Sequence, residues 1–184
     1  MSGLPKTGRR IEDLPAELPG KEFAIRNSQS AIHAAIRQAG ENDAPAILAL
    51  EESSFADPHE RFHVRQIRRL IRSPSAIVIV AQAKGRVVGW AAALTRRHAG
   101  GVTGRVYAIA VDPAARGMKI GRQLMARILS LLKRQGADRI YLEVRQDNQP
   151  ALALYHKLGF KDIKLLADYY RPGLHALRMV LDQR

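Results

Sequence analysis

The chain has 184 residues, which is enough for one domain with a sizeable core. Its 30 Lys and Arg residues outnumber 17 Asp and Glu residues, and the net charge of +13 favours anionic partners such as phosphates, nucleic acid or acidic peptides. There is no cysteine, which excludes disulfides, a thiolate metal site and a cysteine nucleophile. No apolar run approaches the roughly 20 residues that span a membrane, and the first residues lack a secretory pattern. We therefore expect a globular, cytoplasmic protein with no membrane association.

Residues 1–28 differ in composition from the rest of the chain. Pro5, Pro15 and Pro19 stand there among glycines and charged residues, with no sustained hydrophobic period. We expect an N-terminal arm over 1–28 that is disordered or loosely docked, and a single domain over 29–184.

Hydrophobic periodicity and turn residues predict the elements of this domain in chain order. A short strand at Ile32–Ile36 precedes a helix that Asn42 or Asp43 would cap. The predicted elements that follow are a helix over 57–72, strands over 76–83, 86–94 and 104–111, a helix from about 120 to 135, a strand over 139–144, a helix over 149–158, and two strands around the turn at 171–173. This order predicts a mixed α/β sheet rather than a regular βαβ array.

The segment "VDPAARGMKIGRQL", Val111–Leu124, joins a predicted strand to a helix start through a short basic loop. A helix start presents free backbone N–H groups and the positive end of the helix dipole, which together attract anions. Gly117 and Gly121 would let the backbone approach a ligand, and Arg116, Lys119 and Arg122 add positive charge. On this segment alone, a solvated loop with two glycines is an equal alternative.

The segment "HERFH", His59–His63, matches the HExxH pattern of zinc proteases. Gln66 and Arg69 stand where the extended pattern has glycine and a third histidine. The arginines around it would repel a cation. We expect no metal site.

A second segment, "LEVRQDNQPALALYHKLGF", covers Leu142–Phe160. Together the two segments resemble the GNAT superfamily of acetyl-CoA-dependent N-acetyltransferases over about residues 34–181. Arg116 and Gly121 match the first and last positions of the family's R/Q-x-x-G-x-G/A loop. The positions that match the N-x-x-A-x-x-L-Y-x-x-x-G-F element are Asn148, Ala151, Leu154, Tyr155, Gly159 and Phe160. The resemblance implies a mostly antiparallel central sheet with helices on both faces.

The resemblance also implies acetyl-CoA as co-substrate. The backbone of Ile109–Val111 would pair with the pantetheine arm, and the loop amides would hold the pyrophosphate. The implied cofactor-binding residues are Ile109, Ala110, Val111, Arg116, Gly117, Met118, Lys119, Ile120, Gly121, Arg122 and Asn148. Lys119 departs from the pattern, because the family has glycine there. Lysine fits this position if φ is negative, and its effect on cofactor binding is open.

Amine acetylation needs a base for the ammonium and an acid for the departing thiolate. Glu143 lies in the apolar strand "RIYLEV", where desolvation would make it a better base; a Glu paired with Arg139 or Arg145 is the structural alternative. The resemblance is strongest to the ribosomal-protein N-terminal alanine acetyltransferases, and implies Glu143 as base and Tyr155 as acid. The alternative for Tyr155 is a core ring with a hydrated hydroxyl. A backbone N–H near Val111 would hold the oxyanion.

The implied reaction is direct transfer in a ternary complex to a primary amine, chiefly a protein or peptide N-terminus. Tyr169 and Tyr170 would border that acceptor. Small-molecule amines are a second reading, and a catalytically weak module that binds coenzyme A or nucleic acid through the arginines of residues 60–72 is a third. Only 5% of residues are aromatic and no nucleic-acid motif is present, so nucleic acid is not an expected partner. A monomer and a homodimer both remain open.

Overall fold

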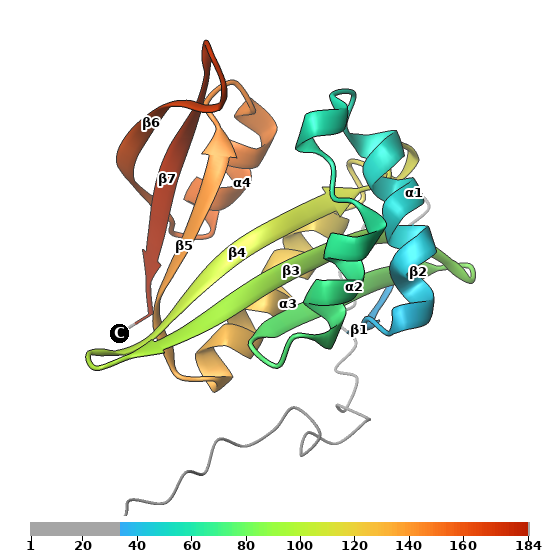
Figure 1. The fold of residues 1–184 in the computed structure, drawn as a ribbon, viewed down its shortest axis with the longest axis horizontal. Coiled ribbons are helices and arrows are strands. Elements are labelled where there is room, and N and C mark those ends of the chain that lie inside the picture. Colours follow the sequence, from blue (N-terminus) through green and yellow to red (C-terminus); the bar gives the residue numbers. More distant parts are fainter. Residues whose placement is uncertain (1–33, 184) are drawn as a thin grey trace, which may run out of the picture. The chain divides into compact units, whose positions relative to one another are not determined.

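The computed structural model describes residues 34–183 (Figure 1). The arm proposed for 1–28 and the start of the first predicted strand, Ile32, lie outside these residues. Among the helices of residues 34–183, none is long and apolar enough to cross a membrane.

The predicted elements are present, with shifted boundaries. The strands are β1 (Ala35–Gln38), β2 (Ala76–Ala83), β3 (Arg86–His98), β4 (Gly101–Val111), β5 (Ala137–Arg145), β6 (Lys161–Arg171) and β7 (Leu174–Asp182). The helices are η2 (Glu41–Asp43), α1 (Ala44–Ser54), η3 (Pro58–Glu60), α2 (Val64–Arg72), η4 (Pro113–Ala115), α3 (Ile120–Arg134) and α4 (Gln149–Lys157). The helix predicted over 57–72 is two separate pieces, η3 and α2.

The strands form one sheet in the order β1-β2-β3-β4-β5-β7-β6. Among the strand pairs of residues 34–183, β4–β5 alone is parallel, and the other pairs are antiparallel. The expected mixed, mostly antiparallel sheet is therefore confirmed.

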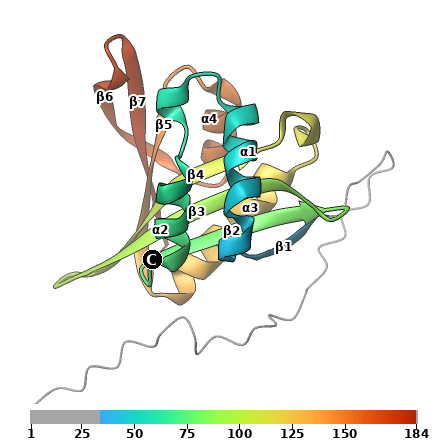
Figure 2. The same cartoon turned by 45° about the vertical axis from the view of Figure 1, so that its right-hand side comes forward.

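Helices cover both faces of this sheet, as predicted (Figure 2). On one face α1 and α2 pack on Trp90, while on the other α3 and α4 pack on Ile140 and Leu142. Helix α3 lies so close to the sheet that two strand glycines are required. A Cβ at Gly89 or Gly104 would lie 3.0 Å from a side chain of α3.

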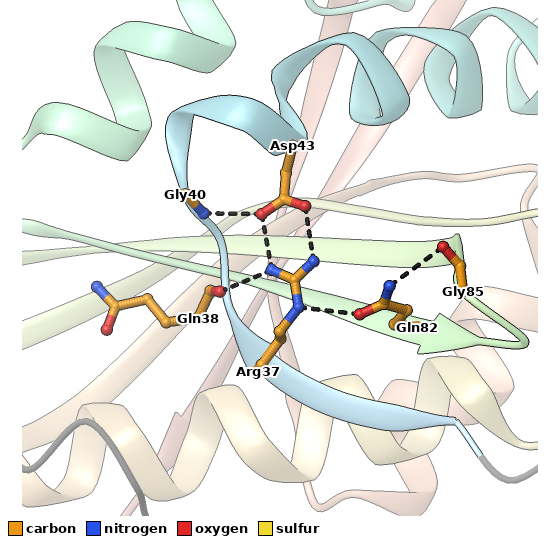
Figure 3. Close-up of polar contacts among 6 residues, drawn as sticks. All are labelled: Arg37, Gln38, Gly40, Asp43, Gln82 and Gly85. Carbon is orange, nitrogen blue, oxygen red and sulfur yellow. Dashed lines mark hydrogen bonds and ion pairs between the residues drawn. The ribbon is translucent and has the colours of Figure 1, made fainter.

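The junction between β1 and α1 is fixed by Asp43 (Figure 3). Asp43 does precede α1, but its carboxylate does not cap the helix. It accepts bonds of 2.7 and 2.8 Å from the guanidinium of Arg37 and one of 2.8 Å from Gly40 N, and Arg37 also donates to Gln82. The hydrogen bond from Arg37 lowers the pKa of Asp43. Strand β1 and α1 are thus tied to β2.

Strands β4 and β5 separate partway along their length (Figure 1). Their ladder begins at Val102 and ends at Arg105 opposite Tyr141, although β4 continues to Val111. An irregularity opposite Ala92 and Ala93 leaves Tyr107 without a register partner on β3. Beyond this irregularity the alternation of side chains between the two faces of β4 reverses. Val106 packs on the face covered by α3, whereas Ala108 and Ala110 pack on the face covered by α1. The remaining edge of β4 is open toward β5.

Candidate active site

The basic loop enters α3 through backbone turns with positive φ. The Asp112 side chain accepts from Ala114 N at 2.9 Å and starts η4, after which Arg116 is extended. Gly117 has φ of 80° and Lys119 has φ of 61° immediately before α3 begins. A Cβ added at Gly117 would have no atom within 4 Å, so the loop surface there is open.

The backbone N–H groups from Gly117 to Arg122 make no hydrogen bond with any acceptor in residues 34–183. The first intrahelical partner appears at Gln123, whose N–H donates to Lys119 O at 3.0 Å. Consecutive free donors at a helix start, with exposed Arg116 and Lys119 beside them, are suited to bind a multiply charged anion.

The conformation of Lys119 bears on whether lysine fits this position. The condition of a negative φ is not met, because Lys119 adopts the left-handed conformation, with φ 61° and ψ 11°. The loop needs this conformation to aim its amides outward, which is why glycine suits the position. The lysine takes the backbone shape of the glycine and keeps its side chain exposed.

The end of β4 offers a second set of backbone groups. Ile109, Ala110 and Val111 pair with Ala91, Trp90 and Gly89 of β3 on one side only. No strand of the described chain pairs with the other edge, because β5 has diverged. An extended ligand could add to this edge as a strand does.

Asn148, a proposed cofactor residue, has a structural role in this structure. Its Oδ1 accepts from Ala151 N at 3.2 Å and caps α4, with Pro150 in the first turn. Its Nδ2 N–H groups make no hydrogen bond within residues 34–183 and can donate to a ligand.

Glu143 lies at the point where β4 and β5 separate. Its Oε1 accepts from Arg178 Nε at 2.8 Å, and its Oε2 accepts from Arg105 Nε at 2.8 Å. The side chain is 6% exposed. The environment and the partners of Glu143 both differ from those predicted. The carboxylate lies among guanidinium groups and not in an apolar environment, and its partners are neither Arg139 nor Arg145.

The physical reason for these corrections is the sheet. Leu142 and Val144 point to the core, so Glu143 points to the opposite face. There the antiparallel register places Arg178 of β7 directly opposite Glu143. Arg105 of β4 reaches it from the last paired position before the strands separate. Sequence reasoning missed both arginines because strand pairing, not sequence distance, brings them together.

Tyr155 is 5% exposed and belongs to the core between α4 and the sheet, with its ring 5.9 Å from that of Phe160. Its hydroxyl makes no hydrogen bond within residues 34–183. Burial, with a smaller contribution from Tyr170, raises the pKa of Tyr155 above its usual 10.0. The phenol is therefore protonated throughout the neutral range.

Tyr169 and Tyr170 project from an irregular part of β6. The β6–β7 ladder is interrupted between Leu166 and Arg171. Asp168 has φ of 52° in this interruption. The rings of Tyr169 and Tyr170 meet at 5.0 Å, and Arg105 Nη2 donates to Tyr169 OH at 3.0 Å. Burial, followed by the charges of Tyr169, Glu60 and Glu143, raises the pKa of Tyr170 to about 12. The tyrosine pair thus lies beside Glu143.

The "HERFH" segment also lies in this region. It crosses η3 and ends at His63, the residue before α2, so its histidines do not share one helix. Glu60 accepts from Arg145 Nη1 at 2.6 Å. A hollow of about 290 Å³ opens beside it, lined by Asp57, Glu60, Tyr170 and Arg171. No group of three metal-ligating side chains occurs among residues 34–183.

The sheet with one diverging parallel pair, and a free helix start next to the opening, define the fold class of the coenzyme A-dependent acyltransferases. The model of the acetyltransferase (GNAT) family matches residues 44–160, and the chain belongs to this family. The resemblance inferred from the two motifs is therefore confirmed.

Relatives of the chain include proteins named N-alpha-acetyltransferases. An N-alpha-acetyltransferase of Sulfurisphaera tokodaii is 31% identical over 173 residues, which cover 87% of this chain and 93% of that protein. N-alpha-acetyltransferase RimI of Mycobacterium tuberculosis is 39% identical over 115 residues, covering 62% and 71%.

Other relatives are longer proteins. A mycothiol acetyltransferase of Saccharomonospora viridis is 33% identical over 139 residues, covering 69% of this chain. The chain spans only 45% of that protein and 32% of an uncharacterized relative from Mycobacterium leprae.

Solved structures show the same fold. The ribosomal-protein-S18-alanine N-acetyltransferase of Escherichia coli superposes with a TM-score of 0.71 at 24% identity, covering 82% of this chain and 94% of that one. The NatC complex bound to Gag peptide and CoA gives 0.71 at 20% identity, covering 82% and 98%. At these identities the likeness concerns the fold alone.

Proposed function

We propose that this protein transfers an acetyl group from acetyl-CoA to a primary amine, at the N-terminus of a protein or peptide. The observation that carries this proposal is the run of unbonded N–H groups at Gly117–Arg122, next to the open edge of β4 at Ile109–Val111. The first would hold the pyrophosphate of acetyl-CoA and the second its pantetheine arm. The family membership of the chain supports this assignment.

In this proposal Glu143 takes the proton of the acceptor ammonium. Arg178 donates one hydrogen bond to Oε1, and Arg105 contacts Oε2 through Nε and, at 2.7 Å, through Nη2, whereas a carboxylate has about four acceptor positions. A remaining position can accept from an amine or from a water between the two. Arg105 and Arg178 hold the carboxylate in one orientation, which is what a positioned base requires.

Tyr155 would protonate the departing thiolate of coenzyme A. Burial raises the pKa of Tyr155, so its phenol carries a proton at neutral and mildly alkaline pH, where an α-amine is already partly deprotonated. Its hydroxyl has no partner among the described residues, which leaves it available to the sulfur. A backbone N–H near Val111 would stabilise the oxyanion in a direct transfer through a ternary complex.

The acceptor would enter beside Tyr169 and Tyr170. The hollow there has two carboxylates, Asp57 and Glu60, and an α-ammonium is a cation that they attract. The names of the RimI and Sulfurisphaera relatives agree with an N-terminal acceptor. Small-molecule amines remain the second candidate, since mycothiol acetyltransferases are also among the relatives.

The test is release of thiol from acetyl-CoA in the presence of peptides that differ at their first residue, with lysine-blocked peptides and small amines as parallel acceptors. The protein has no cysteine, so the thiol reagent reacts with released coenzyme A and not with the protein. We expect turnover with N-terminal peptides, its loss in Glu143→Gln, and retention in the control Glu52→Gln, which alters an exposed carboxylate of α1. Turnover with small amines alone would exclude the N-terminal acceptor, and failure to bind acetyl-CoA would reject the whole assignment.

A further inference from the structure

Helix α2 carries a stripe of arginines on its outer face. Ile67 and Leu70 are buried against the sheet, and the exposed arginines are Arg65, Arg68, Arg69 and Arg72. Their spacing of three and four residues places them on one side of the helix. They line a surface hollow of about 560 Å³ together with Ser73. Among residues 34–183, no acidic residue lines this hollow.

Helix stability accounts for only part of this stripe, because Arg69 and Arg72 lie in the last turn, where cations complement the helix dipole, whereas Arg65 and Arg68 do not. Arginines three and four residues apart repel one another, and a cation in the first turn, such as Arg65, opposes the helix dipole. Arg72 is paired with Glu41, with Nε 2.8 Å from Oε1. Arg65, Arg68 and Arg69 form no hydrogen bond or ion pair with any part of the described chain, although the charge of Arg68 contributes, after Arg72, to lowering the pKa of Glu41. Three guanidinium groups thus face solvent from a single hollow.

We propose that this arginine face binds the phosphodiester backbone of a double-stranded nucleic acid. Arginine presents forked donors that match phosphate oxygens. A duplex carries about one charge per 1.7 Å of its axis in a rigid array, which suits a fixed stripe that is about 10 Å long from Arg65 to Arg72. A flexible acidic peptide would first have to be ordered to match it.

The contact involves the backbone and not the bases. Ile67 and Leu70 are buried on the sheet, so only the outer side of α2, with its arginines, can face a duplex. The helix sequence VRQIRRLIR has no aromatic side chain on which a base could stack. Binding is therefore independent of sequence, the same for RNA and DNA duplexes, and strongly dependent on salt. It does not depend on acetyl transfer.

The experiment is fluorescence anisotropy of labelled RNA and DNA duplexes, titrated with the full chain over a series of salt concentrations. The test variant is Arg65→Gln, Arg68→Gln and Arg69→Gln combined. The control variant removes the same charge from exposed β3 residues, with Arg86→Gln, Arg96→Gln and Arg97→Gln combined. Thermal unfolding of all three proteins verifies that they are folded.

We expect the test variant to bind about tenfold more weakly at low salt. Its slope of log K against log salt should fall by about 2 to 3, since about 0.9 counterion is released per phosphate contact. The control variant should lose much less of its affinity and of its salt dependence. Equal losses in the two variants would overturn the proposal, because binding would then follow total charge. Equal binding of polyglutamate would also overturn it and would indicate an acidic protein as partner.

Discussion

The indole Nε1 of Trp90 donates a 2.8 Å hydrogen bond to Glu51 Oε1 in the interior between β3 and α1. The other carboxylate oxygen of Glu51 accepts from Phe62 N at 3.0 Å, so one side chain joins the sheet, α1 and the loop before α2. Glu51 is 1% exposed. The ring of Phe62 in turn lies 5.5 Å from those of Trp90 and Tyr107. Glu51 therefore fixes the loop that brings Glu60 to the candidate acceptor side.

Replacement of Glu51 by Gln should destabilise the protein, because one of the two buried N–H donors would then face the amide NH₂. An unsatisfied buried donor costs about 1–3 kcal/mol. Burial raises the pKa of Glu51 above its ordinary value of about 4.5, although the bonds from Phe62 and Trp90 oppose this. For a raised pKa, the native state binds more protons than the unfolded state, so the stability contributed by Glu51 is lost as pH rises.

The destabilisation of Glu51→Gln relative to wild type should therefore be larger at pH 5 than at pH 8. Urea unfolding at the two pH values measures it. Glu52→Gln, an exposed neighbour on α1, is the matched control and should show no such difference. A gap that widens with pH would contradict the direction of the pKa shift.

Replacement of Lys119 by Gly should raise stability slightly. The left-handed conformation costs a residue with a Cβ about 1 kcal/mol, and the greater freedom of glycine in the unfolded chain offsets part of the gain. The melting temperature should rise by about 1–2 °C. Lys119→Ala keeps the Cβ and should show no gain. Coenzyme A affinity, measured by calorimetric titration, should stay within threefold, since the exposed side chain is replaced while the amide positions are kept. A glycine variant less stable than the alanine variant would contradict this account.

Replacement of Tyr155 by Phe should reduce kcat by about 10²-fold, the lower end of the range for loss of a general acid. Stability should change by less than about 1 kcal/mol, because the hydroxyl makes no hydrogen bond in the described chain. Since burial raises the pKa of Tyr155, the wild-type enzyme should show no loss of kcat from phenol ionisation between pH 7 and 10. Steady-state kinetics over this range, beside thermal unfolding, separate the two effects.

Tyr107→Phe, which removes an exposed hydroxyl from β4, is the matched control for Tyr155→Phe. An unchanged kcat in Tyr155→Phe would show that the ring only packs.

Replacement of Arg178 by Gln should lower kcat about tenfold through loss of one of the two bonds that orient Glu143, as expected for a misplaced base. The KM for acetyl-CoA should stay within twofold, because Arg178 lies on β7 and not at the helix start of α3. Arg178→Lys should restore part of kcat. A rise in KM with kcat unchanged would place Arg178 in substrate binding instead.

The sequence determined the elements and the family. Alternating hydrophobicity and turn residues located the β2–β3 hairpin, and the 3.6-residue period located α3, because these signals are local. The two motifs led to the family, since each motif lies within one continuous segment. The free amides of Gly117–Arg122 were anticipated for the same reason: a strand, a loop and a helix start suffice to make them.

Only the tertiary structure decided what surrounds the candidate catalytic residues. Arg105 and Arg178 reach Glu143 through strand register, and Glu60 reaches Arg145 across 85 positions of sequence. The hydrophobic periodicity predicts one helix over 57–72, but the structure has two, η3 and α2. Between them the backbone N–H of Phe62 donates to the Glu51 carboxylate and not to a helical carbonyl. Lys119 has a positive φ because the loop must turn there to enter α3. Such contacts depend on which segments pack together, and a local pattern carries no information about that.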